Sequence, residues 1–188
     1  MPSYVKTSAL MGLAVVVLAA SSAAAKLPSA DKILSDAKAK AAGDKKNVML
    51  VFEASWCPPC QQFDKFVSDK RIRDIFNQHF VLATVAVGEE VAGNGNKNNP
   101  GSAELLYKLG GVHFENTSVP FIFIIDPDGK ILVTSERPMP GQKMGDNIGY
   151  PTEPEEIDWF MKMMKKSTPT LSDEDSQYIE DWLQRNAG

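Results

Sequence analysis

Two cysteines, Cys57 and Cys60, stand directly between an apolar run and an amphipathic segment, and this arrangement restricts the fold more than any other feature of the sequence. The run before them, VMLVF over residues 48–52, has the pattern of a strand covered on both faces. The segment after them, residues 61–80, spaces apolar side chains at helical intervals, with a break expected near Ser68. The sequence therefore predicts strand, turn and helix in that order, with both sulfur atoms at the start of the helix.

The position of the two cysteines at a helix start also has a chemical consequence. Two cysteines separated by two residues can form a disulfide within one helical turn. The free N–H groups and the positive end of the helix dipole stabilise a thiolate, which lowers the cysteine pKa from its usual value of about 8.5. We therefore expect Cys57, at the turn, to be the nucleophile and Cys60, one turn later and more shielded, to be the resolving thiol. Pro59 suits the first turn because its missing N–H costs nothing there.

The rest of the chain alternates predicted helices with apolar strands. A helix is expected to begin after Ser29, and a capping box of Thr152 and Glu155 predicts another near the C-terminus. Two polar or Gly- and Pro-rich loops are expected over residues 89–101 and 137–151. Together these patterns predict an α/β fold, a mixed sheet with helices on both faces. Its other expected helices are 31–42, 102–110, 152–166 and one from 172, and its other expected strands are 81–87, 121–125 and 130–134.

Composition excludes several classes of protein. With 188 residues, 43% hydrophobic and 23% charged, the chain lies in the range of one ordinary globular domain. The net charge is −4 and the basic residues are scattered, so no electrostatic footprint of a nucleic-acid binder is present. The sequence has no Gly-rich phosphate loop after a strand and no CxxCH, so no nucleotide, flavin or haem cofactor is expected. We expect the Cys57–Cys60 disulfide itself to be the redox centre.

The first 25 residues have the pattern of an export signal. Lys6 precedes an apolar run that is too short to span a bilayer, and small residues up to Ala25 fit a cleavage site. We therefore expect a signal peptide over residues 1–25 and an exported domain over residues 26–188, periplasmic or secreted. That compartment is oxidising, so the presence of two nearby thiols there calls for a chemical explanation.

Two segments of the sequence resemble the thioredoxin superfamily. VFEASWCPPCQQF is similar to the strand and active-site segment of that family, and TSVPFIFIIDPDGKI to its proline, third strand and hairpin. The resemblance implies a thioredoxin-like fold and an exported thiol-disulfide oxidoreductase. It also implies that Val119-Pro120 is a cis peptide bond facing the cysteines, that Val119 and Pro120 dock a polypeptide substrate, and that Trp56 forms the rim of the site.

The sequence departs from the family pattern in two respects. The buried carboxylate that thioredoxin carries six residues before its first cysteine is replaced by Val51. Glu53 projects to the same side of the strand, one step nearer the cysteines, so we hypothesise that it accepts the proton of Cys60; the alternative is an ordinary surface carboxylate. The interval between Cys57 and Pro120 is also long, and the excess is expected in residues 89–101 and 113–118, near the rim.

The residues between the cysteines favour a direction for the reaction. Pro58 and Pro59 supply neither a charge nor a side-chain donor to a thiolate, which favours a reductant over a strong oxidant. We expect a monomer that reduces disulfides of partner proteins and receives electrons from a membrane-bound or soluble thiol reductase. An oxidase or isomerase is the alternative within the same class.

Three other interpretations of the cysteine pair remain open. The pair could be a structural disulfide, although so small a loop removes little entropy from the unfolded chain. It could be half of a copper site completed by His113, Met139 or Met144. Finally, the domain could be a binding or chaperone-like module in which the helical extension over residues 168–188 offers a partner surface.

Overall fold

The computed structural model describes residues 1, 26–142 and 145–187. Apart from Met1, the expected signal peptide over residues 1–25 lies outside the described residues. Within the described residues, no helix combines the length and the apolar character that crossing a bilayer requires.

A four-stranded mixed sheet with the strand order β2-β1-β3-β4 forms the centre of the molecule. β1 pairs in parallel with β2 and antiparallel with β3, and β3 pairs antiparallel with β4. β1 therefore lies inside the sheet, which explains why its middle five residues are all buried. The strands are β1 (Asn47–Glu53), β2 (Phe80–Ala86), β3 (Phe121–Ile125) and β4 (Ile131–Thr134).

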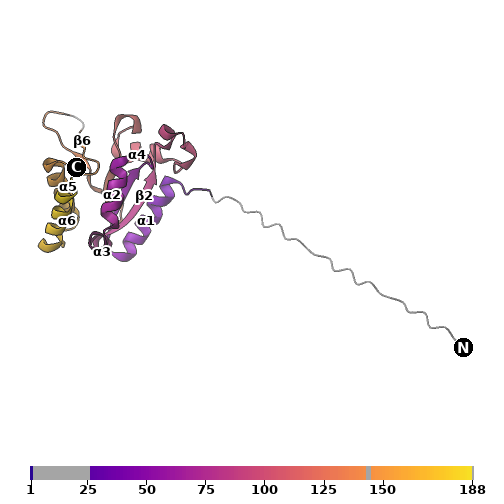
Figure 1. The fold of residues 1–188 in the computed structure, drawn as a ribbon, viewed down its shortest axis with the longest axis horizontal. Helices are drawn as coiled ribbons and strands as arrows, with labels where there is room; N and C mark the ends of the chain where they lie inside the picture. Colours follow the sequence, from indigo (N-terminus) through magenta and orange to yellow (C-terminus); the bar gives the residue numbers. More distant parts are fainter. Residues whose placement is uncertain (2–25, 143–144, 188) are drawn as a thin grey trace.

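Helices cover both faces of this sheet, so the predicted α/β architecture is confirmed. Alternate residues of β1 point to two separate hydrophobic cores, Leu50 and Phe52 to one and Met49 and Val51 to the other. The first core is closed by α1 (Ala30–Asp44) and α4 (Ser102–Gly110). The second is closed by α2 (Pro58–Ser68), α3 (Lys70–His79), α5 (Pro154–Ser167) and α6 (Asp173–Arg185). Figure 1 shows α5 and α6 on the opposite side of the sheet from α1.

The expected break in the helix after the cysteines lies at Asp69. Its backbone N–H bonds to the carbonyls of Lys65 and Phe66, which ends α2. Its side chain accepts hydrogen bonds from the N–H groups of Arg71 and Ile72, which begins α3. A single residue thus caps the end of α2 and the start of α3.

The two loops expected from the sequence contain more structure than the sequence indicated. The segment over residues 89–101 holds two 3-10 helices, η1 (Glu89–Ala92) and η2 (Gly95–Lys97). A third 3-10 helix, η3 (Phe114–Asn116), precedes β3. After β4, the short strands β5 (Glu136–Arg137) and β6 (Asp146–Asn147) pair with each other and bring the chain back beside β3.

The C-terminal helices differ only slightly from the expectation. The capping box of α5 is formed by Glu153 and Glu156, one residue later than predicted, because Pro154 occupies the first helical turn. Thr152 still donates its backbone N–H to the Glu156 carboxylate at 2.9 Å. α6 begins after Ser172 as expected, and Ile179 and Leu183 on its inner face are fully buried.

Candidate active site

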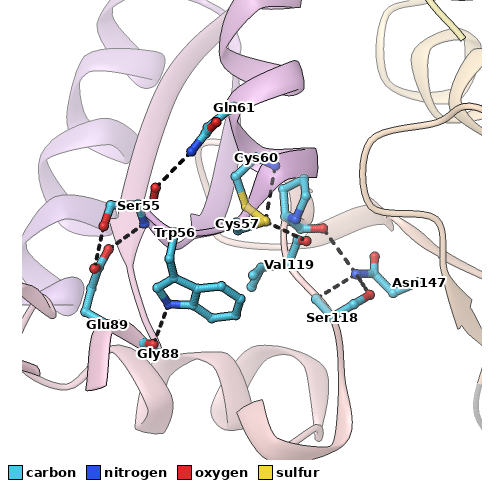
Figure 2. Close-up of a disulfide and its surroundings, with 11 residues drawn as sticks. Ser55, Trp56, Cys57, Cys60, Gln61, Gly88, Glu89, Ser118, Val119 and Asn147 are labelled. Atoms are coloured by element: carbon cyan, nitrogen blue, oxygen red, sulfur yellow. Dashed lines mark hydrogen bonds between the residues drawn. A yellow bond between two sulfur atoms is a disulfide. The ribbon is translucent and has the colours of Figure 1, made fainter. Parts of the chain in front are cut away.

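The two cysteines lie at the N-terminus of α2 and form a disulfide (Figure 2). Their Cα atoms are 5.3 Å apart. Cys57 is the N-cap residue, and its Sγ accepts the backbone N–H of Cys60 at 3.2 Å, while Pro58 and Pro59 fill the first helical positions. Cys57 is 3% exposed and Cys60 2%, so burial does not distinguish the two sulfur atoms. Their positions on the helix do, because only Cys57 lies where helix N–H groups converge.

The Val119-Pro120 peptide bond is cis, as the resemblance implied. The carbonyl oxygen of Val119 lies 3.2 Å from Cys57 Sγ, so this segment faces the disulfide directly (Figure 2). The side chains of Val119 and Pro120 are both buried, and Val119 belongs to the same hydrophobic core as the two cysteines.

A side chain from the short strand β6 holds this cis-proline segment in place. Asn147 Nδ2 donates hydrogen bonds to the carbonyl of Ser118 at 2.8 Å, to Ser118 Oγ at 3.0 Å and to the carbonyl of Pro120 at 3.1 Å. Asn147 Oδ1 accepts the hydroxyl of Ser135 at 2.6 Å. Nothing in the sequence pattern of the loop over residues 137–151 pointed to this residue.

The residues just before Cys57 are held by the insertion over residues 89–101. Ser55 donates its backbone N–H and its hydroxyl to the two carboxylate oxygens of Glu89, at 2.6 and 2.7 Å. Glu89 is only 2% exposed, although the sequence placed it in a polar loop. Gln61 of α2 donates its side-chain amide to the carbonyl of Ser55 at 3.2 Å. Ser55 is therefore fixed from two sides.

Trp56 lies on the rim of the site beside the disulfide and Val119 (Figure 2). Its indole Nε1 donates to the carbonyl of Gly88 at 2.8 Å, and the side chain remains 37% exposed. Gly88 has φ +73° and lies against the ring of Phe114, where a Cβ atom would collide with that ring. Phe114, in the segment over residues 113–118, therefore lies against Gly88, the residue directly before the segment over residues 89–101, on the side of Trp56.

Three carboxyl groups gather near the end of β1. Glu53 is the last residue of β1, and burial raises its pKa to about 7, with repulsion from Asp64 and then Glu89 adding to the shift. Asp64 lies one helical turn after Cys60 on α2, and partial desolvation raises its pKa as well. Glu53 thus lies among acidic groups at the end of the strand that leads to the cysteines.

His113 was one of the residues proposed as a copper ligand. His113 stacks on the ring of Tyr107, with the ring centroids 4.4 Å apart. Met144 lies outside the described residues. Among the residues that the structure describes, no group of three or more His, Cys, Asp or Glu side chains is placed to hold a metal ion.

A hollow of about 410 Å³ adjoins the cis-proline segment on the side away from Trp56. Ser118 and Asn147 form part of its wall, together with the exposed side chain of Asn116. The candidate site is therefore a buried disulfide flanked by an aromatic rim on one side and a hydrogen-bonded backbone segment on the other.

Comparison with known proteins gives one family. A family model described as thioredoxin-like matches residues 30–127, which is more than half of the chain and includes both cysteines and Pro120. No curated protein sequence matches the chain.

Several solved structures are similar to this chain at low identity. The disulphide isomerase from Xylella fastidiosa is 18% identical, covers 91% of this chain and 98% of its own, and has a TM-score of 0.48. The C-terminal domain of DsbD from Neisseria meningitidis, in its oxidised form, is 15% identical. The match covers 76% of this chain and 99% of that domain, with a TM-score of 0.43. A thioredoxin from Thermus thermophilus is 21% identical. The match covers 58% of this chain and 75% of that thioredoxin, with a TM-score of 0.38.

Proposed function

Since the chain belongs to the thioredoxin-like family and is a thiol-disulfide oxidoreductase with a CxxC disulfide, we propose that it reduces the disulfides of exported partner proteins. Cys57 is the nucleophile, because its sulfur lies at the N-terminus of α2 and accepts a helix N–H. Cys60 is the resolving thiol. Trp56, Val119 and Pro120 dock the polypeptide that carries the substrate disulfide.

The reaction proceeds by two exchanges. The Cys57 thiolate attacks one sulfur of the substrate disulfide, so that a mixed disulfide forms and the first substrate thiol leaves. Cys60 loses its proton and attacks Cys57 Sγ, so that the Cys57–Cys60 disulfide forms and the second substrate thiol leaves. Two electrons pass from the protein dithiol to the substrate. A dithiol donor, a membrane-bound or soluble thiol reductase, returns the protein to its reduced state.

The observation that carries the reducing direction is the set of groups around Cys57. Among the described residues, its sulfur contacts one backbone N–H and one carbonyl oxygen, and no side-chain donor. Four residues before Cys57, at the end of β1, Glu53 is repelled by two other carboxyl groups. A strong oxidant needs a stabilised thiolate in its reduced form, whereas negative charge and few donors disfavour a thiolate.

The reduction potential of the Cys57–Cys60 pair tests this direction. The protein is equilibrated in graded glutathione or dithiothreitol buffers, and the fraction of free thiol is measured. We expect a value near that of thioredoxin, about −270 mV, or lower. A value near about −120 mV would mean that the protein donates disulfides instead.

Trapping tests the two-cysteine cycle. Cys60→Ser leaves the nucleophile but removes the resolving thiol, so mixed disulfides between Cys57 and its substrates should accumulate on non-reducing gels. Cys57→Ser is the matched control and should trap nothing. If neither variant traps a partner and the wild-type pair does not exchange with thiols, the domain is a binding module.

Glu53 is proposed as the proton acceptor for Cys60. Its pKa of about 7 allows it to exchange protons near neutral pH, and Asp64, one turn after Cys60, lies close enough to perturb it. Glu53→Gln should therefore lower the rate of the second exchange and change its dependence on pH. Rates that match the wild type across the pH range would show that Glu53 is an ordinary carboxylate.

Export is proposed from residues 1–25, together with a monomeric state for the domain. Fractionation of cells and the mass of the isolated protein test the first proposal, because cleavage near Ala25 removes a defined mass. Sedimentation tests the second.

A further inference from the structure

We propose that Asn147 is a positioning residue that fixes residues 118–120, and with them the backbone of Val119, against the disulfide for a polypeptide substrate. The inference rests on the proposed function and adds a specificity-determining residue to it. Asn147 lies on β6, 20 residues beyond the end of the family match at residue 127. It acts on the site only through the hydrogen bonds of its side-chain amide.

The orientation of the Asn147 amide is determined by its partners. Ser135 Oγ accepts the backbone N–H of Ile122 at 2.8 Å and donates its one hydroxyl hydrogen to Asn147 Oδ1 at 2.6 Å. Nδ2 must then face the cis-proline segment, where its two hydrogens meet three acceptors. The opposite orientation of the amide would place Oδ1 against two carbonyls.

The support behind Asn147 is rigid because it is built on the central sheet. Ser135 is completely buried, and its backbone N–H donates to the carbonyl of Ile122 on β3 at 2.8 Å. Its own carbonyl accepts the N–H of Ile148, the residue after Asn147, at 3.0 Å. The amide of Asn147 is therefore connected to β3 by side chain and backbone alike.

The hydrogen bonds from Asn147 to Ser118 and Pro120 form a clamp on residues 118–120. One carbonyl of this segment receives no hydrogen bond from Asn147. The carbonyls of Ser118 and Pro120 both accept from Nδ2, whereas that of Val119, between them, points to Cys57 Sγ at 3.2 Å. A polypeptide laid along the segment requires the Val119 backbone at a fixed distance from the sulfur. A small thiol reaches the sulfur without that backbone, so the clamp should affect the two kinds of substrate differently.

Asn147→Asp tests the clamp, since the carboxylate has the same shape but no hydrogen to donate. Asn116→Asp is the matched control: it makes the same chemical change in the wall of the same hollow, on an exposed side chain with no part in the clamp. Asn147→Ala removes the hydrogen bonds without adding charge and is the second variant. We measure kcat and KM for the reduction of insulin, the rate of exchange with dithiothreitol, and amide exchange in fragments that cover residues 117–122.

For both Asn147 variants we expect kcat/KM with insulin to fall between about 10- and 100-fold, because a misplaced docking element costs that much. The rate with dithiothreitol should stay within about twofold of the wild type, and amide exchange over residues 117–122 should accelerate. Asn116→Asp should resemble the wild type in all three measurements.

The measurements distinguish a failure of the proposed role of Asn147 from a failure of the proposed function. If the wild type reduces insulin and the Asn147 variants reduce it equally well, or if the rates with insulin and dithiothreitol fall together, Asn147 is not a positioning residue for polypeptides and the proposed function stands. If the wild type reduces no polypeptide, the proposed function is wrong. Amide exchange then still decides the role of Asn147, because unchanged exchange over residues 117–122 would overturn the clamp in either case.

Discussion

Replacing Glu53 with glutamine should stabilise the folded protein at alkaline pH and not at acidic pH. Burial and neighbouring carboxyl groups raise the pKa of Glu53 from 4.5 to about 7. A rise of this size corresponds to at most about 3 kcal/mol of stability lost once both states are ionised. Because the side chain is only partly buried, solvent screening reduces the effect, and we expect about 1 to 2 kcal/mol.

The sign follows from proton binding. Below pH 4.5, Glu53 is protonated in both the folded and the unfolded chain, so its ionisation does not change stability. Between pH 4.5 and about 7 the unfolded chain releases the proton while the folded protein retains it, so the wild type loses stability as the pH rises. Above that window the loss is complete. Glutamine carries no proton to lose, so the variant gains relative to the wild type across the same window.

Urea unfolding of the disulfide-bonded protein at pH 4.5, 6 and 8 measures this gain. Glu90→Gln is the control, because Glu90 is exposed and the hydrogen bond from Asn98 lowers its pKa, so no gain is expected there. If Glu53→Gln changes the free energy of unfolding by the same amount at pH 4.5 and pH 8, the carboxyl group is not destabilised by burial and the reasoning fails.

Three further substitutions test the packing around the site by urea unfolding. Glu89→Gln weakens the two hydrogen bonds to Ser55 and should cost about 1.5 to 3 kcal/mol, whereas a loss below about 0.5 kcal/mol would mean that Glu89 does not hold Ser55. Gly88→Ala should cost more than about 1 kcal/mol, because φ is +73° and the new Cβ meets Phe114; a neutral result would contradict that contact. Leu183→Ala should cost about 2 to 5 kcal/mol, and a smaller loss would indicate that α6 is loosely attached.

The sequence alone predicts the elements whose pattern lies within a few neighbouring residues. The apolar run before Cys57 predicts β1, the helical spacing after it predicts α2 and α3, and the resemblance around Pro120 predicts the cis bond that the structure contains. Periodicity and turn residues act over a few positions, so these elements could be inferred from a single chain. Even the break at Asp69 was expected to within a residue.

The residues that hold the site together could not be inferred in this way. Glu89 bonds to Ser55 across 34 residues, and Asn147 bonds to Ser118 across 29. Each lies in a loop whose polar composition is typical of solvent-exposed chain, and only the folded sheet brings it to its partner. By contrast, the docking of α6 onto the body through Ile179 and Leu183 could be predicted from their helical spacing.

The position of β3 has a consequence for any attempt to isolate a smaller domain. The family match ends at residue 127, before β4, α5 and α6. A chain cut there would retain the disulfide, but β3, FIFII, would become a bare sheet edge with its apolar side chains uncovered. An unpaired edge strand of this composition pairs with the same strand of another copy, and cross-β aggregation follows. The last third of the chain therefore covers an apolar sheet edge as well as completing the fold.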